Sequence, residues 1–565
     1  MRLAAEYDNL IQPVIARAAA QPDLLTLVFI EENGEKEFIR AAQFHTQSLA
    51  YARALQSIGI APGDLVVLVL QHCRELLYAF WGAMYLGAVP SIFPFLTEKL
   101  DPAIYMQRVH DLIAQEGVRA VITFPGFKDE LRALLADVGC QVLATNDTSV
   151  DLVSGNFVVS QPDGERIAFL QHSSGTTGLQ KGVALSHRAV LNQIDAYSEA
   201  IQLGAQDVIV SWLPLYHDMG LIASLVMPVV AGVPVVWMSP FHWTRSPKIL
   251  MRAIHEHRGT LCWLPNFAYN HCVRAISKRD LEGLRLDSLR MVINCSEPCR
   301  AESHAMFLER FAPYGFREEA LATCYAMAEN TFAVTQSQPG VAPHVDWVST
   351  DALQRARQAV PAPPASAGST AMVSCGTPIS GCEVAIADDH GNRLPERHVG
   401  EVILRSNSML TEYYHRPDIT AQALRDGWYF TGDMGYIADG HLYIAGRKKD
   451  LIIVGGKNIY PQDLEAIANN IPGIHPGRAV AFGVFDERVG SEAVVMVCEL
   501  ADGHSGEDEH REIERLLRLR VVQQSEITLS DVRLVGRKWL IKTSSGKISR
   551  AANREKYLAE FQPHA

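Results

Sequence analysis

The stretch Gln171-His-Ser-Ser-Gly-Thr-Thr-Gly-Leu-Gln-Lys-Gly-Val183 lies between two segments with regular patterns. The apolar run Ile167–Leu170 before it predicts a strand, and an amphipathic pattern that begins near Ser186 predicts a helix. Between them lie hydroxyl side chains, three glycines and Lys181. Glycines let backbone N–H groups turn toward an anion, hydroxyls donate hydrogen bonds and the lysine adds positive charge. The stretch therefore predicts a phosphate-binding loop, with an ordinary surface loop as the alternative.

The surrounding chain alternates between short apolar runs and amphipathic patterns from residue 24 to about residue 300. This alternation predicts βαβ units and mostly parallel sheets covered by helices. After residue 370, closely spaced strands with glycine turns predict an antiparallel subdomain. The predicted strands are Ile167–Leu170, Leu65–Leu70, Ala120–Phe124, Val208–Leu213, Val233–Met238 and Leu289–Asn294, and the predicted helices include Ala41–Ile58, His187–Ile201 and Ser246–His257.

The expected fold class is α/β, in two parts of unequal size. Residues 1–446 are expected to form a large N-terminal α/β domain with parallel-sheet subdomains and a small antiparallel subdomain. Residues 447–565 are expected to form a small α+β C-terminal domain. Its predicted strands are Leu451–Val454, Arg478–Gly483 and Glu492–Glu499, and its predicted helices are Pro461–Asn469 and Glu507–Gln523.

Charge and composition narrow the class of protein. The 565 residues carry a net charge of −12, which argues against nonspecific binding to nucleic acid or to an anionic membrane. The ten cysteines are scattered without a Cys-x-x-Cys pair, and no signal peptide is predicted, so we expect reduced thiols and a cytoplasmic location. Gly220–Met238 has no charged residue, but Pro228, Gly232 and Pro234 interrupt it, so a buried helix followed by a strand is expected and not a membrane span.

The loop Gln171–Val183 closely resembles the signature loop of the adenylate-forming (AMP-binding) superfamily, which includes acyl-CoA synthetases and the adenylation domains of peptide synthetases. Those enzymes join a carboxylic acid to AMP, release pyrophosphate and pass the acyl group to a thiol or similar acceptor. The loop is not a Walker A loop, because no lysine in it follows glycine and precedes serine or threonine. The resemblance implies phosphate contacts from Ser173, Ser174, Gly175, Thr176, Thr177, Gly178 and Lys181.

Two later segments resemble the parts of this superfamily that surround adenine and the metal. Asn294-Cys-Ser-Glu-Pro298 follows an apolar strand and resembles the Gly-Glu-Pro segment beside adenine. Thr323-Cys-Tyr-Ala-Met-Ala-Glu329 resembles the segment whose tyrosine packs on the nucleotide and whose glutamate holds Mg²⁺. One carboxylate suffices for Mg²⁺ bound to a triphosphate, although Glu329 taken alone would be an ordinary solvated residue. The implied nucleotide contacts are Ser296, Glu297, Pro298, Cys324, Tyr325, Ala326 (where the family usually has glycine), Met327 and Ala328.

A third pair of segments is the most specific part of the resemblance. Tyr429-Phe-Thr-Gly-Asp433 and Gly446-Arg-Lys-Lys-Asp450 occur in the family's order. A carboxylate accepts hydrogen bonds from both ribose hydroxyls, which is the role implied for Asp433. The resemblance implies nucleotide contacts for Ile444 and Arg447, and it places at Lys449 the hinge about which a mobile C-terminal domain rotates. A solvated basic turn is the alternative for residues 447–449.

Two further side chains carry the implied chemistry. Lys547, in Lys542-Thr-Ser-Ser-Gly-Lys-Ile-Ser-Arg550, matches an essential lysine that approaches the α-phosphate, although a flexible tail is the alternative. A cation is needed there because a carboxylate attacks a phosphate, which brings like charges together. His217, in Ser211-Trp-Leu-Pro-Leu-Tyr-His-Asp-Met-Gly220, is implied beside the reacting carboxylate, with a satisfied core histidine as the alternative. The apolar stretch Leu221–Val230 after it favours a fatty or other apolar acid.

The branch of the superfamily depends on an additional stretch at about residues 338–372, with an expected helical core at Thr350–Gln358. Fatty acyl-AMP ligases carry an insertion here, which in that subfamily is thought to restrict the C-terminal domain and disfavour coenzyme A; a surface loop is the alternative. Gly455-Gly-Lys-Asn-Ile-Tyr460, by contrast, resembles the CoA-forming enzymes.

The first expectation for function is therefore a fatty acyl-AMP ligase that uses ATP and Mg²⁺ and passes the acyl group to an acyl carrier protein. The alternatives are an acyl-CoA synthetase that uses coenzyme A and a non-catalytic nucleotide or acyl sensor. Retention of Lys547, Glu329 and Asp433 argues against the sensor.

Overall fold

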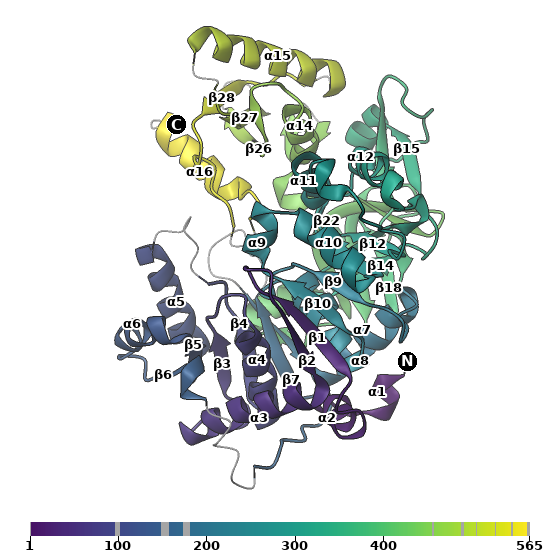
Figure 1. Cartoon of the computed structure of the whole chain (residues 1–565). Helices are drawn as coiled ribbons and strands as arrows, with labels where there is room; N and C mark the ends of the chain where they lie inside the picture. Colours follow the sequence, from purple (N-terminus) through teal and green to yellow (C-terminus); the bar gives the residue numbers. More distant parts are fainter. Residues whose placement is uncertain are drawn as a thin grey trace.

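The computed structural model describes residues 2–95, 102–148, 157–172, 181–454, 457–486, 491–503, 506–525, 527–543 and 546–561. A large lobe built on two extended sheets carries a smaller lobe, drawn at the top of Figure 1, that is formed by the C-terminal residues. The expected α/β fold class is confirmed. The boundary at residues 446 and 447 stays a prediction.

The first large sheet follows the order β20-β8-β7-β4-β3-β5-β6. Its middle strands are parallel, whereas β8 pairs antiparallel with β7 and β20 pairs antiparallel with β8. Strands β3 and β5 are buried along their whole length, because helices cover a parallel sheet on both faces. The bounds are β3 Leu65–Leu68, β4 Val89–Ile92, β5 Ala120–Thr123, β6 Gln141–Ala144, β7 Ile167–His172, β8 Gly182–Ser186 and β20 Glu412–Tyr413, with helices α3 Ala41–Ser57, α4 Arg74–Leu86, α5 Pro102–Glu116 and α6 Lys128–Leu134.

The second large sheet follows the order β17-β14-β13-β12-β11-β9-β10-β1-β2. The six strands from β13 to β1 are parallel, and antiparallel strands close both edges. The strands are β1 Leu25–Ile30, β2 Lys36–Arg40, β9 Ile209–Ser211, β10 Val235–Met238, β11 Leu261–Leu264, β12 Met291–Asn294, β13 Leu321–Ala326, β14 Ala333–Gln336 and β17 Thr377–Pro378. The helices of this region are α1 Leu3–Glu6, α2 Ile11–Ala20, α7 His187–Ala200, α8 Met227–Ala231, α9 Pro240–Arg245, α10 Lys248–His257, α11 Asn266–Ala275 and α12 Ala301–Phe311.

An antiparallel subdomain follows, as expected from the sequence after residue 370. Its sheet has the order β18-β19-β22-β21, and β23 pairs with β22. The bounds are β18 Cys382–Ala387, β19 Gly400–Ser406, α13 Pro417–Ala423, β21 Leu424–Arg425, β22 Trp428–Ala438 and β23 His441–Arg447. Strands β22 and β23 form a hairpin whose register brings Asp433 opposite Arg447.

The small lobe has its own apolar cores. A three-stranded sheet of β26, β27 and β28 packs with helices α14, α15 and α16, and the hairpin β24–β25 precedes it. The bounds are β24 Ile452–Val454, β25 Lys457–Ile459, α14 Pro461–Ala468, β26 Ile474–Asp486, β27 Ser491–Leu500, α15 Glu507–Ser525, β28 Asp531–Val535 and α16 Arg550–Phe561.

Three details differ from the sequence analysis. A strand that was not predicted, β8, follows the predicted phosphate loop. Helix α7 begins at His187, as predicted, and the Ser186 hydroxyl caps it by accepting a hydrogen bond from the Ala189 N–H at 3.1 Å. The helical core expected at Thr350–Gln358 is present but shorter: residues 350–356 are helical, with a π-helix at Ala352–Ala356, between strands β15 (Val345–Ser349) and β16 (Ser369–Val373). Several predicted strands are shorter in the structure by one to three residues.

The uncharged stretch Gly220–Met238 forms a buried π-helix (Met219–Val226), helix α8 and strand β10, as expected. Among the described residues, none of the helices combines the length and the apolar character that crossing a membrane requires.

Candidate active site

The candidate site lies where the ends of strands β12 and β13 meet the β22–β23 hairpin and the loop before α16. Parallel strands present their carboxyl ends at the same edge of a sheet, which is the usual place for a ligand. The predicted phosphate contacts Ser173, Ser174, Gly175, Thr176, Thr177 and Gly178 lie outside the described residues, and Lys181 at the start of β8 is described. The roles of the residues below stay predictions, and the structure supplies their geometry.

Asp433 is a buried carboxylate with donors at both oxygens. The Tyr325 hydroxyl donates to Oδ2 at 2.6 Å, and the Arg447 Nε lies 3.0 Å from Oδ1. Only 6% of the residue's surface is exposed. Burial and the neighbouring Asp433 raise the pKa of Tyr325 far above its usual value, so the phenol stays a donor. The nearby carboxylate of Asp433 also raises the pKa of Arg447, so the guanidinium group keeps its charge.

Glu329 lies in a single 3₁₀ turn (Ala328–Asn330) between β13 and β14. The Tyr413 hydroxyl donates to Glu329 Oε1 at 2.7 Å, and the Glu329 carbonyl accepts from the Leu410 N–H at 2.8 Å. The Lys181 Nζ lies 5.0 Å from the centre of the Tyr413 ring. The predicted phosphate cation and the predicted metal carboxylate therefore share one tyrosine.

Tyr413 is a site residue that the sequence analysis missed. It is separated from Glu329 by 84 residues, and no spacing rule connects the two. The sequence carries no local signal for it, because β20 forms by pairing with β8, which lies far away along the chain.

The segment expected beside adenine has a constrained backbone. Ser296 has a φ of 69°, in the left-handed region that non-glycine residues seldom adopt. The Glu297 Oε2 accepts the Phe267 N–H at 2.9 Å, which joins the segment to the start of α11. Cys324 is buried within β13, and the Met327 N–H donates to the Phe332 carbonyl at 2.8 Å in the turn that follows Ala326. Strain at Ser296 is typical of a segment that is shaped for a ligand.

Lys547 reaches this segment from the small lobe. Its Nζ donates to the Ser296 carbonyl oxygen at 2.8 Å across 251 residues of sequence. A tight turn presents it, because the Thr543 N–H donates to the Lys547 carbonyl at 2.7 Å and the Gly546 N–H to the Thr543 carbonyl at 2.9 Å. The Lys547 side chain of the small lobe therefore contacts the segment that is expected beside adenine, although the residue is exposed.

His217 and Asp218 lie close to Lys547. Burial, followed by the Lys547 ammonium group, lowers the pKa of His217 to about 3. Burial raises the pKa of Asp218, with the Glu329 carboxylate acting in the same direction and Lys547 acting against it. The His217 Nε2 is buried and has no hydrogen-bond partner within the described part of the chain. A neutral imidazole with a free nitrogen at this position is suited to a polar ligand atom, not to a core contact.

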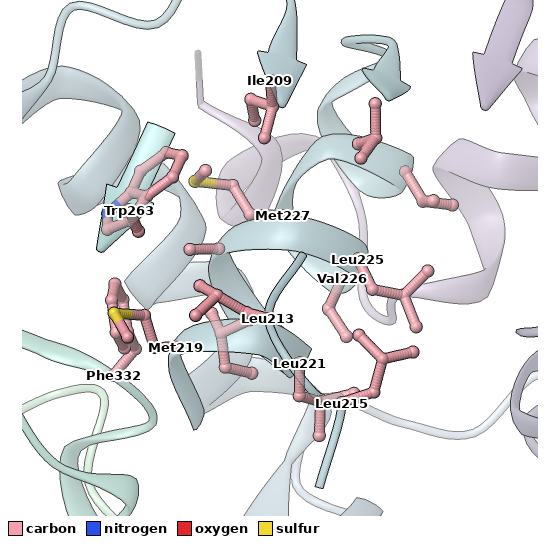
Figure 2. Close-up of a cluster of buried hydrophobic side chains, with 14 of the residues drawn as sticks. Ile209, Leu213, Leu215, Met219, Leu221, Leu225, Val226, Met227, Trp263 and Phe332 are labelled. Carbon is pink, nitrogen blue, oxygen red and sulfur yellow. The ribbon is translucent and has the colours of Figure 1, made fainter. Parts of the chain in front are cut away.

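The wall beyond His217 is apolar. Figure 2 shows Leu213 and Leu215 near Met219 and Leu221 of the π-helix. Every residue of Leu221–Val230 is buried. The one polar pair in this region satisfies itself, since the Ser224 hydroxyl donates to the Ser211 hydroxyl at 2.8 Å. Such a wall suits an alkyl chain and disfavours an ammonium group.

The predicted hinge lies between the lobes, in a 3₁₀ turn at Lys448–Asp450. Burial, with the positive charge of Arg447, lowers the pKa of Lys449. Asp450 is held by Arg550 Nη1 of the small lobe at 2.8 Å. Ile444, expected at the nucleotide, pairs with Gly435 in the β22–β23 hairpin, beside a register shift. These residues connect the hairpin that carries Asp433 to the lobe that carries Lys547.

The insertion contacts the small lobe directly. The Asn458 Nδ2 in β25 donates to the Gln354 carbonyl oxygen in the insertion's π-helix at 2.9 Å. Tyr460 is 2% exposed and packs in an apolar cluster with Val348 and Leu353 of the insertion. The Arg300 Nη2 also contacts Asp463 Oδ1 on α14 at 3.0 Å. Rotation of the small lobe would have to break these contacts.

The donor set suits Mg²⁺ bound to a triphosphate. Glu329 offers one half-buried carboxylate beside Lys181, with Asp218 close enough for the two carboxylates to influence each other. Mg²⁺ takes one or two protein carboxylates together with phosphate oxygens and water. Glu329 is the side chain that would hold the metal.

The chain is similar in sequence to several known proteins. Residues 15–414 match the family described as AMP-binding enzyme. A Caulobacter vibrioides protein whose name assigns it provisionally as an acyl-CoA synthetase is 32% identical over 529 residues, which cover 93% of this chain and 91% of that protein. The medium-chain-fatty-acid–[acyl-carrier-protein] ligase JamA of Moorena producens is 29% identical, with 98% of this chain and 95% of JamA covered.

A solved structure agrees with the model over the whole chain. It comes from a study of fatty acyl-adenylate ligases from E. coli and L. pneumophila, has a TM-score of 0.90 and 28% sequence identity, and covers 99% of both chains. The family match spans more than half of the chain, and the solved structure has the same fold. The chain therefore belongs to the AMP-binding enzyme family and is a ligase.

Proposed function

We propose that this ligase is a fatty acyl-AMP ligase. It activates a fatty or other apolar carboxylic acid with ATP to give acyl-AMP and pyrophosphate, and then passes the acyl group to the phosphopantetheine thiol of an acyl carrier protein. The observation that carries the proposal is the contact of Lys547 Nζ with the Ser296 carbonyl at 2.8 Å, beside His217 and an apolar wall.

Each residue has a separate role in the adenylation step. A carboxylate oxygen of the acid attacks the α-phosphorus, a new O–P bond forms and the bond to pyrophosphate breaks. Lys547 offsets the repulsion between the two anions, and a preorganised charge of this kind in a water-poor site is worth roughly 10²–10³ in rate. Neutral His217 orients the acid, and Asp433 holds the ribose. Mg²⁺, held by Glu329, would neutralise the phosphate oxygens and the departing pyrophosphate.

The adenylation step is tested by acid-dependent exchange of labelled pyrophosphate into ATP. A panel of saturated fatty acids of increasing length is compared with amino acids and short polar acids. The proposal expects exchange with one or more apolar acids and none with an amino acid, because the wall Leu221–Val230 carries no carboxylate that could pair with an ammonium group. Absence of exchange with every acid would favour a nucleotide or acyl sensor.

The acceptor is the finer part of the proposal. Support comes from the insertion, because Gln354, Val348 and Leu353 hold Asn458 and Tyr460 of the small lobe and oppose the rotation that would admit coenzyme A. JamA, whose name includes an acyl-carrier-protein acceptor, is among the relatives. Coenzyme A is the second candidate, favoured by the resemblance of Gly455–Tyr460 to CoA-forming enzymes and by the name of the Caulobacter relative.

The two acceptors are separated by supplying each one to preformed acyl-AMP. Enzyme is incubated with coenzyme A or with a phosphopantetheinylated carrier protein, and the thioester is identified by mass spectrometry. We expect thioester on the carrier protein, and we expect Tyr460→Ala to raise the yield of acyl-CoA because it loosens the small lobe. Efficient acyl-CoA formation by the unaltered enzyme would contradict the assignment of the acceptor.

We also propose a cytoplasmic location. It is supported by the ten cysteines, all of which are free thiols, as is usual in a reducing compartment.

A further inference from the structure

Tyr413 occupies a position between three parts of the site that are distant in sequence. It ends strand β20, whose Tyr413 pairs with Val183 in β8 directly after the predicted phosphate loop. The residues just before β20 lie alongside the turn that carries Glu329. The Thr331 hydroxyl donates to the Ser408 carbonyl at 2.7 Å, and the Leu410 N–H donates to the Glu329 carbonyl at 2.8 Å. The residue is 3% exposed.

The side chain of Tyr413 has three separate contacts. Its hydroxyl donates to Glu329 Oε1 at 2.7 Å and lies 2.9 Å from the Tyr429 hydroxyl. The face of its ring lies 5.0 Å below the Lys181 Nζ. Tyr429 belongs to β22, the strand that carries Asp433. One phenol thus connects the elements expected to hold phosphate, metal and ribose.

The direction of these hydrogen bonds is fixed. The Tyr413 hydroxyl lies 2.7 Å from Glu329 Oε1, and a carboxylate oxygen can only accept, so Tyr413 is the donor of this bond. A protonated phenol has one hydrogen to donate, and the carboxylate is the stronger acceptor. The Tyr429 hydroxyl then donates to Tyr413. Because Glu329 Oε1 accepts this bond, the rotation of the carboxylate is limited and Oε2 is left to bind a cation.

We propose that Tyr413 is a positioning residue for the metal and phosphate site: its hydroxyl orients Glu329 toward Mg²⁺ and its ring supports the Lys181 ammonium group. This inference rests on the proposed function, because it takes Glu329 as the metal carboxylate. Tyr413 does not touch the reacting atoms and acts through Glu329 and Lys181. A merely structural tyrosine would fill the same space without altering the dependence of ATP binding on Mg²⁺.

The test removes the hydroxyl alone. Tyr413→Phe keeps the ring under Lys181 and loses the hydrogen bond to Glu329. The affinity of the full-length protein for ATP is measured by calorimetry without any acid, over a range of Mg²⁺ concentrations and in EDTA. The adjacent Tyr414→Phe is the matched control, since Tyr414 is half-buried and stacks on His415 with ring centres 4.0 Å apart.

Tyr413→Phe is expected to raise the Mg²⁺ concentration needed for half-maximal ATP affinity by about tenfold, and to leave the affinity in EDTA unchanged. Tyr414→Phe is expected to match the unaltered protein. In a Glu329→Gln background, Tyr413→Phe should have no further effect on the Mg²⁺ dependence, because the hydroxyl acts through that carboxylate. Calorimetric stoichiometry counts the folded molecules, so a loss of folded protein does not alter the measured affinity.

Two outcomes would overturn the inference. One is an unchanged Mg²⁺ dependence in Tyr413→Phe; the other is an equal loss of affinity with and without Mg²⁺, which a structural role would produce. Pyrophosphate exchange by the unaltered enzyme tests the proposed function separately. Suppose that pyrophosphate exchange fails but Tyr413→Phe still raises the Mg²⁺ concentration needed for half-maximal ATP affinity. The role of Tyr413 in nucleotide binding would then stand, and the proposed reaction would be rejected.

Discussion

Asp433 lies buried, and both of its carboxylate oxygens meet a donor. The Tyr325 hydroxyl and the Arg447 guanidinium group each contact one oxygen, at 2.6 and 3.0 Å. When one partner of a buried charged group is removed, the remaining group stays buried without a hydrogen bond. The free energy lost is then larger than that of an ordinary hydrogen bond. Single substitutions in this part of the site should therefore affect nucleotide binding selectively.

We expect Asp433→Asn to raise the KM for ATP by about 10- to 100-fold, since hydrogen bonds to charged groups are worth about 1.5–3 kcal/mol each. The maximal rate of pyrophosphate exchange should fall less than the affinity. Asp439→Asn is the control: this aspartate lies at the tip of the same hairpin, and its side chain is 84% exposed. Equal KM values for the two variants would contradict the role of Asp433 in holding the ribose.

Lys547 should affect the rate and not the affinity. Lys547→Ala is expected to lower pyrophosphate exchange by roughly 10²–10³-fold because one preorganised charge is lost at the reacting phosphate. ATP affinity, measured by calorimetry, should stay within about twofold of the original. Lys278→Ala removes the same charge from an exposed position and should leave both quantities unchanged. Exchange at the original rate would remove Lys547 from the mechanism.

Among the elements, the π-helix Met219–Val226 shapes the acyl wall. A wider helix of this kind is rare and often lies at a functional site. The Asp218 carboxylate caps its start by accepting from the Met219 N–H at 2.8 Å. At Gly220 the helix passes the backbone of Pro214 so closely that an added Cβ would lie 2.2 Å from the Pro214 carbonyl oxygen. The glycine is required by this close approach.

Gly220→Ala is therefore expected to lower the free energy of unfolding by about 1–3 kcal/mol, as overpacked core substitutions do. The shift of the helix should also weaken the binding of the acid. Urea unfolding measures the first effect, and the KM for the acid measures the second. Gly204→Ala is the matched control, because its nearest neighbour would be 4.0 Å from the new Cβ and the backbone there is not left-handed. Similar unfolding curves for the two variants would contradict the steric argument.

At the scale of the molecule, buried histidines tie stability to pH. His172, His187 and His304 are buried, and burial lowers the pKa of each to about 4. Each is neutral in the folded protein at pH 5, whereas the unfolded chain, with a pKa near 6.5, is protonated there. Their contribution to stability is complete above about pH 6.5 and is lost as the pH falls toward 4.

The urea midpoint should therefore decrease from pH 7 to pH 5, because proton uptake on unfolding lowers the free energy of unfolding by at most about 2 kcal/mol per histidine over this range. His187→Gln should reduce this pH dependence, whereas the exposed His390→Gln should not. His187 lies outside the candidate site, and its Nδ1 accepts the Leu10 N–H at 3.3 Å. A midpoint that is constant from pH 7 to pH 5 would contradict the assignment of these histidines as neutral in the fold.

The amino-acid sequence alone determined the fold class, the family and the expected site residues. It could do so because each of these depends on local pattern: apolar runs such as Leu65–Leu68 form buried parallel strands wherever they occur, and the segments around Lys181, Glu329, Asp433 and Lys547 carry their chemistry in consecutive residues. Strand β8 was missed because its five buried residues form a strand only by pairing with β7, which no local pattern shows.

Only the tertiary structure decided which of these segments meet. The contact between Lys547 and Ser296 spans 251 residues, and the hydrogen bond between Tyr413 and Glu329 spans 84. Such contacts depend on how the two lobes and their sheets pack. One hydrogen bond contributes little energy, and it leaves no recognisable pattern in the sequence. The contact between the insertion and Tyr460 is also decided by the tertiary structure, because it joins apolar side chains that become neighbours only after folding.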